Sequence, residues 1–363
     1  TFDGNGAQPG VTPLPNGFYT ILAQGDMQDA AGNPLALTGF TDPGIDAFVV
    51  PFKVDDLSPT DPTDGDLDSP VNFTFDLTQD QPAVARAPSG HYVVVWTSEV
   101  QDVDATGALL PVHTDILAQQ FDPFGIPVRG EFTVNTVFDP ATDGDQHSPD
   151  VAIDDDGNFV VVWAGNGDGL GDADGIFSQR FDADGETIGS QVRVNKLIQY
   201  EQKFPAVAMD PDGDYVITWT TYGDGDVDGV MARRYNSLGQ AQETQEFVAN
   251  TTWINRQDHS DVAMDAQGNF VIVWAANQHA LDGSEWGIVG QRFSNAGARL
   301  GGEFLVNSYK LDDQMDPHIG MDDAGNFAVT WASMLEDGSS WGVYGRRFNA
   351  AAAPQGNAFR ANR

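Results

Sequence analysis

The sequence has no cysteine, and its 363 residues carry only 17 lysine and arginine side chains against 54 acidic ones. The absence of cysteine excludes disulfides and thiol chemistry. The formal net charge of −37 disfavours nucleic acid and anionic lipid, because both are bound through lysine and arginine. No apolar run reaches the ~20 residues of a membrane span. We therefore expect neither a nucleic-acid partner nor a membrane span.

The acidic surplus favours cations as ligands. Calcium takes oxygen ligands, and a surface of like charges destabilises the compact state unless it is neutralised. Solubility is the alternative explanation of the same charge. The chain begins Thr1-Phe2-Asp3, which we interpret as part of a longer, secreted bacterial protein. We expect it outside the cell or on the cell surface.

A short apolar segment that ends in tryptophan recurs five times along the chain. The five tryptophans are spaced by 67, 56, 55 and 57 residues: Trp96, Trp163, Trp219, Trp274 and Trp331. Each copy contains the same four segments. The first carries Val-Ala in four of the copies, the second ends in the tryptophan, the third ends in Phe or Tyr with an arginine before it in four copies, and the fourth carries an asparagine. Glycines between the first two segments predict hairpin turns with positive φ: Gly90, Gly157, Gly213, Gly268 and Gly325.

Four short strands repeated five times predict an all-β fold. Residues 71–363 are expected to form a five-bladed β-propeller of four-stranded antiparallel blades. Small residues on the first strand suit a position near the axis: Ala85, Ala152, Ala208, Ala263 and Gly320. A superhelical β-array remains the structural alternative. The pattern resembles the repeat propellers of large secreted bacterial proteins, loosely related to Asp-box and FG-GAP repeats.

The first part of the chain follows another pattern. Residues 1–54 contain a Phe18-Tyr19 strand, the loop Asp29-Ala30-Ala31-Gly32-Asn33-Pro34-Leu35 and a closing strand at 48–54. This segment resembles the C-terminal half of a bacterial Ig-like domain of the S-layer type. The resemblance implies an N-terminal Ig-like β remnant, which an acidic Pro- and Asp-rich linker at 55–70 joins to the propeller.

One strand is surplus to the five repeats. Phe73-Thr74-Phe75-Asp76 matches the fourth segment, yet it precedes the first complete copy. We expect it either to pair beside the last blade or to join a neighbouring chain, which would be self-assembly by strand addition.

Two groups of loop residues are candidate binding sites. Asp224, Asp226 and Asp228 alternate before a glycine, as carboxylates around a calcium ion do, and Asp168, Asp172 and Asp174 form a looser version. Trp286 and Trp341 lie between the second and third strands and are candidates for stacking on polysaccharide, because exposed aromatic residues mark recognition sites.

No catalytic set recurs in the repeats. The six histidines do not recur at one repeat position and are interpreted as surface or loop residues, and the third-strand arginines as pairing within their own blades. We therefore predict a non-catalytic extracellular binding or scaffolding protein, used in adhesion, a surface layer or a filament, stabilised by calcium and contacting polysaccharide or another protein. The alternative is a carbohydrate-recognising propeller module of a larger secreted enzyme. A propeller hydrolase comes third, and a carboxylate pair buried at the axis would favour it.

Overall fold

The computed structural model describes residues 17–24, 47–54, 71–72, 77–101, 109, 112–135, 144–166, 174–198, 201–221, 229–252, 255–283 and 285–362. The chain divides into two compact units, residues 1–69 and 70–363. In the first unit, β1 (Gly17–Gln24) pairs antiparallel with β2 (Ala47–Val54). This hairpin does not test the Ig-like resemblance, which stays a prediction, as do the segment boundaries at residues 54 and 70.

The second unit contains five sheets of four antiparallel strands, which we call blades 1 to 5. Blade 1 is β3 (Gln79–Arg86), β4 (Tyr92–Val100), β5 (His113–Phe121) and β6 (Phe132–Thr133). Blade 2 is β7 (Gln146–Ile153), β8 (Phe159–Gly165), β9 (Gly175–Phe181) and β10 (Thr187–Arg193), and blade 3 is β11 (Gln202–Met209), β12 (Tyr215–Thr221), β13 (Gly229–Tyr235) and β14 (Phe247–Val248). Blade 4 is β15 (Gln257–Met264), β16 (Phe270–Asn277), β17 (Trp286–Phe293) and β18 (Phe304–Leu305), and blade 5 is β19 (Gln314–Met321), β20 (Phe327–Met334), β21 (Trp341–Phe348) and β22 (Phe359–Arg360).

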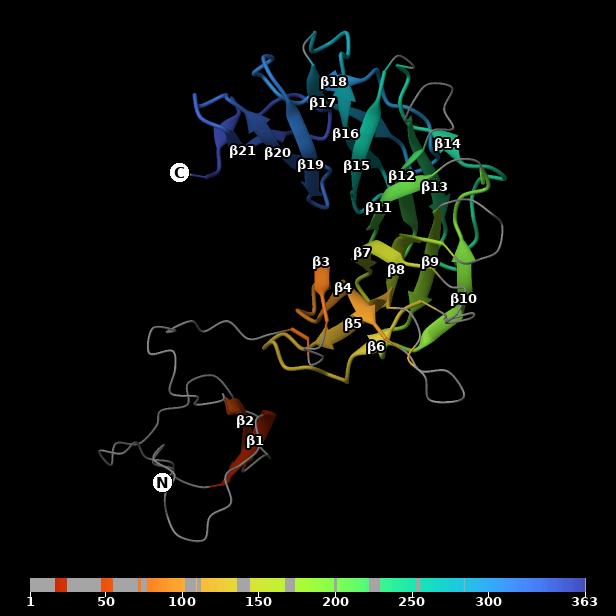
Figure 1. Cartoon of the computed structure of the whole chain (residues 1–363), viewed down its shortest axis with the longest axis vertical. Coiled ribbons are helices and arrows are strands. Elements are labelled where there is room, and N and C mark those ends of the chain that lie inside the picture. The colour runs from red at the N-terminus through yellow and green to blue at the C-terminus, as the bar shows by residue number, and fades with distance from the viewer. Residues whose placement is uncertain are drawn as a thin grey trace, which may run out of the picture. The chain divides into compact units, whose positions relative to one another are not determined.

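The predicted all-β propeller architecture is confirmed. The described residues contain no helix, and the blades follow one another around their first strands (Figure 1). The hairpin glycines predicted to need positive φ have it, from 77° at Gly268 to 94° at Gly90. The surplus strand at 73–76 lies outside the described residues. Since the same residues contain no helix at all, no long apolar helix is found there that could cross a membrane.

Each blade has two different faces, and neighbouring blades join unlike faces. One face, called here the Trp face, carries the tryptophan and the aromatic residues of the second and third strands. The other, the small face, carries alanine, valine and isoleucine. At the junction of blades 2 and 3, the small face of blade 2 (Ala152, Val160, Val162, Ala164, Ile176) packs on the Trp face of blade 3 (Val207, Tyr215, Ile217, Trp219, Met231). The five repeat tryptophans are at most 4% exposed, as expected for core residues.

The asparagine that ends each repeat stabilises the start of the third strand. Its Oδ1 accepts a hydrogen bond from a backbone N–H of that strand, at 2.8 to 3.0 Å: Asn135 from Ile116, Asn195 from Ile176, Asn250 from Val230, Asn307 from Ile288 and Asn362 from Val343. A buried N–H without a partner is costly. The asparagine therefore recurs because it pairs an N–H that the short fourth strand cannot reach.

This contact predicts a difference between buried and exposed copies. Asn250 is 0% exposed, whereas Asn362 is exposed and water can replace its contact. We expect Asn250→Ala to lower the free energy of unfolding by about 1–3 kcal/mol, because it leaves the Val230 N–H unpaired. The matched control Asn362→Ala should change it by less than about 0.5 kcal/mol. Urea denaturation of the three proteins measures both values, and equal losses would contradict this assignment.

Candidate functional site

The first strand of every blade contains the same irregularity. The pairing register shifts between its second and fifth residues, as at His147/Asp150 and Asp258/Asp261. The residue between has a φ of 51–53° in all five copies: Gln81, Ser148, Phe204, His259 and Asp316. A bulge of this kind redirects side chains, and positive φ at non-glycine residues is costly and clusters at functional sites. The bulges therefore draw attention to the first strands.

Three titratable residues follow these bulges at one repeat position and form what we call the axial cluster: Asp150, Asp261 and His318. They come from β7, β15 and β19 of blades 2, 4 and 5. His318 Nδ1 lies 3.4 Å from Asp261 Oδ2. Asp150 interacts electrostatically with both of the other residues. The fold thus brings together groups that are far apart in the sequence.

Each carboxylate of the cluster accepts backbone hydrogen bonds from two blades. Asp150 accepts from the N–H of Val151 at 2.9 Å and from that of Val207, in blade 3, at 2.8 Å. Asp261 accepts from Val262 at 2.8 Å and from Ile319, in blade 5, at 2.9 Å. These contacts hold both carboxylates in fixed orientations.

Joining the blades does not by itself explain the two carboxylates. Ala83 and Ala206 occupy the same position in blades 1 and 3. Blades 1 and 3 nevertheless pack on their successors through the same kind of apolar cluster. Because half of the junctions form without a carboxylate, the two aspartates add polar chemistry that the architecture does not require.

The surroundings of the cluster change its protonation. Burial, and next the charge of Asp261, raise the pKa of Asp150 to about 7, against two backbone hydrogen bonds that favour the ionised form. Asp150 is surrounded by protein atoms but is still partly accessible to solvent. A hydrogen bond with Asp261 raises the pKa of His318 above its usual value. A carboxyl group that is still protonated near neutral pH can donate a hydrogen bond or a proton.

Aromatic and acidic groups also lie at or beside the bulges of the first strands β11, β15 and β19. The rings of Phe204 and His259 stack with centroids 3.9 Å apart. His259 lies between two carboxylates, with Nδ1 3.5 Å from Asp258 and Nε2 3.8 Å from Asp316. The first strands therefore offer carboxylates, imidazoles and an aromatic ring within a few residues of one another.

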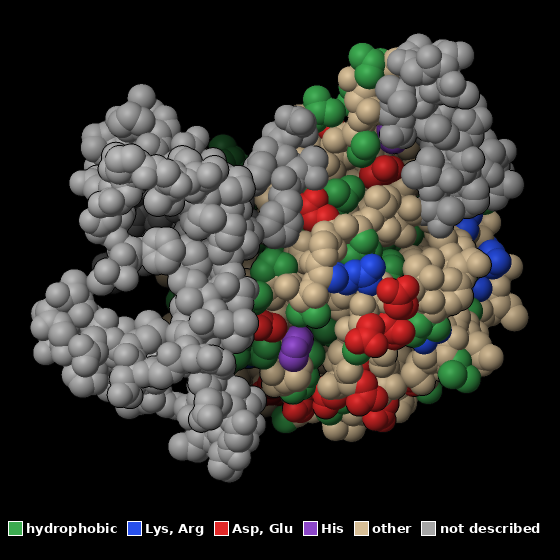
Figure 2. Space-filling view, turned by 90° about the horizontal axis from the view of Figure 1, so that it is seen from below, with side chains coloured by type: hydrophobic (Ala, Val, Ile, Leu, Met, Phe, Trp, Pro, Cys, Tyr) green, Lys and Arg blue, Asp and Glu red, His purple; other side chains and the backbone are tan. Residues whose placement is uncertain are grey.

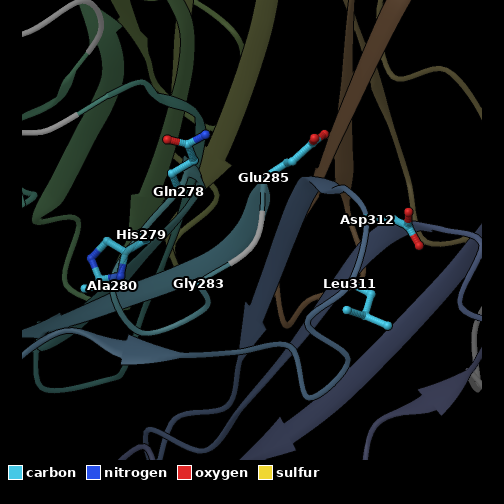
Figure 3. Close-up of a pocket in the computed structure, with 7 residues that line it drawn as sticks. All are labelled: Gln278, His279, Ala280, Gly283, Glu285, Leu311 and Asp312. Carbon is cyan, nitrogen blue, oxygen red and sulfur yellow. The ribbon is translucent and has the colours of Figure 1, made fainter.

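A second polar site is a pocket at the edge of blade 4. Its cavity of about 510 Å³ lies between the loop after β16 and the loop before β19 and is lined by Gln278, His279, Ala280, Gly283, Glu285, Leu311 and Asp312 (Figure 3). Cavities of this size accommodate small ligands.

His279 in this pocket is a structural residue rather than a base. Its Nδ1 accepts the N–H of Leu281 at 3.1 Å, so Nε2 carries the proton and faces Glu303 at 3.0 Å and Thr252 at 2.8 Å. Burial opposes the charge of Glu303, but hydrogen bonds from His279, Thr251 and Thr252 lower the pKa of this carboxyl to about 2. The imidazole therefore cannot accept a proton from Thr252, and the three residues tie the pocket loop to blade 3.

Most of the predicted calcium ligands lie outside the residues that the structure describes. Asp224, Asp226, Asp228, Asp168 and Asp172 lie outside the described residues. Asp174 is described, and its carboxylate lies 3.6 Å from His147 Nε2. Among the residues whose placement is described, no group of three His, Cys, Asp or Glu side chains could hold a metal ion. Calcium stays a prediction, although Figure 2 shows acidic side chains gathered on the lower part of the face it presents.

The two tryptophans predicted to stack on sugar differ from each other. Trp286 is half-buried, packs on the cluster between blades 4 and 5 and has the Arg256 guanidinium 5.8 Å from its ring centroid. Trp341, at the same repeat position in blade 5, is 46% exposed. That these two rings stack on polysaccharide stays a prediction.

Two interpretations of the polar residues need correction. His113 is buried within β5, and His147 and His259 are half-buried on first strands, so these three do not fit a surface or loop position. The exposed His91 and His318 and the loop residue His279 do fit it. The third-strand arginines do not pair within their blade alone. Arg180, Arg234 and Arg292 donate to backbone carbonyls of the next blade, at Ser237, Asn295 and Ala350.

The axial cluster could have been found by comparing the repeats at the fifth position of the first strand, where the residue type differs between copies: Ala83, Asp150, Ala206, Asp261 and His318.

Comparison with known proteins identifies the fold and no family. No family model and no curated protein matches the sequence. A Dyadobacter fermentans protein of unknown function has a similar structure, with a TM-score of 0.53 and 10% identity over 80% of this chain and 85% of that one. A Hadza microbial sialidase has a TM-score of 0.49 and 14% identity over 76% and 57%. An endo-arabinase from Bacteroides thetaiotaomicron has a TM-score of 0.43 and 12% identity over 72% and 92%.

The fold is therefore that of a β-propeller, and glycoside hydrolases are among the proteins with similar structures. These neighbours go against the prediction of a non-catalytic scaffolding protein and against the prediction that the chain is not an enzyme, and they fit the alternative of a carbohydrate-recognising propeller module better. Both rested on the absence of a residue set common to all repeats, but the axial cluster is built from residues that differ between repeats. At these identities the similarity shows the fold and not an activity.

The axial cluster predicts a pH-dependent stability. The pKa of Asp150 is about 7 in the folded chain and near 3.9 in the unfolded chain. Between about pH 3.9 and pH 7 the folded chain therefore binds this proton and the unfolded chain does not, so the contribution of Asp150 to the free energy of unfolding falls as the pH rises. Asp150→Asn removes this loss. We expect the melting temperature of the variant, minus that of the wild type, to increase from pH 4 to pH 8. Asp184→Asn, at an exposed turn, is the charge-matched control, and a pH-independent difference would show that Asp150 titrates normally.

Proposed function

We propose that residues 70–363 are a carbohydrate-recognising propeller module and that the axial cluster is its glycan-binding site. The observation that carries this proposal is the grouping of Asp150, Asp261 and His318 on the first strands, where the blade junctions do not need them. Carboxylates and imidazoles both hydrogen-bond to hydroxyl groups. The stacked Phe204 and His259 rings add an aromatic contact nearby.

The charge of the chain narrows the substrate class. A net charge of −37 repels uronic and sialic acids as it repels other anions. A neutral glycan meets no such barrier, and its hydroxyl groups can donate to the acidic side chains. We therefore propose a neutral polysaccharide or oligosaccharide as the ligand.

Glycoside cleavage is a second candidate function, favoured by the raised pKa of Asp150. Glycosidases use one protonated and one ionised carboxyl group on either side of the scissile bond. Asp150, with a pKa of about 7, is suited to protonate the leaving oxygen, and Asp261 beside His318 is suited to the partner role. This proposal rests on the difference in surroundings between the two carboxylates.

Three further assignments are proposals of the same kind. The alternating Asp224, Asp226 and Asp228 support calcium binding. The Asp-Ala-Ala-Gly-Asn loop at 29–33 supports an Ig-like segment at residues 1–54, and the composition of the chain supports a secreted bacterial protein.

The glycan proposal predicts a specific loss on substitution. We expect the chain to be retained in native gels that contain one or more neutral polysaccharides, and Asp261→Asn to weaken this binding by about tenfold or more. Asp184→Asn removes the same charge at an exposed turn and should bind normally. Reducing-sugar release from the retained polysaccharide tests cleavage, which Asp150→Asn should abolish. No retention by any neutral polysaccharide, or equal retention of all variants, would refute the axial site.

The calcium proposal predicts a stabilisation by the ion. An ion that binds only the folded chain adds about 2.7 kcal/mol at 100-fold its dissociation constant. The melting temperature should therefore be higher in calcium than in chelator at matched ionic strength, and the combined Asp226→Ala and Asp228→Ala substitutions should remove the difference. If the wild type melts at one temperature in both buffers, calcium is not a ligand.

A further inference from the structure

In the part of the chain that the structure describes, the two ends of the blade series each leave part of one face exposed. Val343 on the small face of blade 5 is 45% exposed, whereas its counterparts in blades 1 to 4 are 0% exposed: Ile116, Ile176, Val230 and Ile288. At the other end, Val84 on the Trp face of blade 1 is 64% exposed, whereas Val151, Val207 and Val262 are 4–6% exposed. Figure 1 shows blade 1 (β3 to β6) and blade 5 (β19 to β22) apart from each other.

The uncovered face of blade 5 does not have the character of a terminal cap. End repeats that face water carry polar outer surfaces. Blade 5 instead exposes Ala328, Thr330, Val343 and, at the rim, Trp341 and Phe359. Trp286, the counterpart of Trp341 in blade 4, packs on the next blade. The face therefore has the composition of a blade junction that has no partner.

The two uncovered faces are complementary halves of one interface. Every junction in the chain joins the small face of one blade to the Trp face of the next, and this combination occurs four times. Blade 5 offers a small face. Blade 1 offers the part of its Trp face around Val84, Tyr92 and Val94, whereas Trp96 on that face is already buried, in a pocket that Val71 and Asn72 also line.

A polar contact of the junctions is also left open. Arg180, Arg234 and Arg292 each donate to the carbonyl at one position of the turn between the third and fourth strands of the next blade. At the first junction, Gln120 donates to that carbonyl, of Ala183, at 3.0 Å. Arg347 is the member of this series in blade 5; it is exposed, and its side chain has no hydrogen-bond partner among residues 285–362 or the other described segments. Pro123 holds the corresponding turn position in blade 1.

We propose that this chain self-associates head to tail, with the small face of blade 5 in one copy packed on the Trp face of blade 1 in the next. The interface continues the blade series with the contacts that the chain already uses, including Arg347 to the carbonyl of Pro123. A heterologous contact of this kind forms a ring or an open chain of copies, according to the rotation that it imposes. The proposal does not rest on the proposed glycan function, although the interface would adjoin His318.

The experiment measures the mass of the full chain by sedimentation over a range of concentrations. Wild-type protein should form species larger than the monomer, and their share should increase with concentration. Val343→Asp and Val84→Asp each place a charge in the centre of one half of the interface and should weaken association about tenfold or more. Leu238→Asp, at a turn residue that is 71% exposed, is the matched control and should associate as the wild type does.

Mixing the two interface variants separates this model from others. Val343→Asp keeps an intact blade 1 face and Val84→Asp an intact blade 5 face, so an equimolar mixture should form a dimer and nothing larger. Circular dichroism melts of each variant verify that it is folded.

Three results would overturn the proposal. A wild type that is monomeric at every concentration indicates closure on its own blade 1 or coverage by another segment. If only Val343→Asp abolishes association, and the mixture of the two variants forms no dimer of one copy of each, the contact is a symmetric one between two blade 5 faces. Association that neither substitution affects indicates an interface elsewhere.

Discussion

The packing of a Trp face on a small face is the interaction on which the rest of the structure depends. A single four-stranded sheet cannot bury both of its apolar faces, so each blade is stable only between neighbours. The second strands of blades 2, 3 and 4 carry no charged residue and are buried along their length, apart from the half-buried Asn277 at the end of β16, because they are covered on both sides. Unlike faces also give the series a direction, from blade 1 to blade 5.

This arrangement separates the residues that hold the blades from those free to vary. Tryptophan, the hairpin glycine and the closing asparagine recur because each solves a problem that every blade has: filling a junction, turning with positive φ, and pairing a buried N–H. At the fifth position of the first strand, Asp150 and Asp261 accept N–H groups of the following blade, but alanine holds this position at the other two junctions. Residues such as Asp150 and Asp261 can therefore be placed at the axis without weakening the scaffold, and their chemistry is the most informative sign of function.

The same separation explains what could be predicted from the sequence. The blades, their boundaries and the buried Trp163 or Trp219 follow from periodicity, which reports what the repeats share. The axial cluster could not be found in that way, because Asp150, Asp261 and His318 share a position but not a residue type. Their proximity depends on how blades 2, 4 and 5 converge, and the raised pKa of Asp150 depends on burial that no local pattern encodes. The negative prediction about catalysis failed because it looked for recurrence.

The axial cluster also depends on what covers blade 5. His318 is 78% exposed, although Asp261, held in orientation by the N–H groups of Val262 and Ile319, lies against it. In blades 2 and 4 the carboxylate at the fifth position of the first strand accepts an N–H from the following blade. His318 holds this position in blade 5, where no described blade follows. A Trp face packed there would bring the first strand of a blade 1, with Gln81 and Ala83, beside the cluster. Such burial would remove water from His318 and disfavour its charged form, against the attraction of Asp261. The protonation of His318 would thus depend on whether blade 5 has a neighbour.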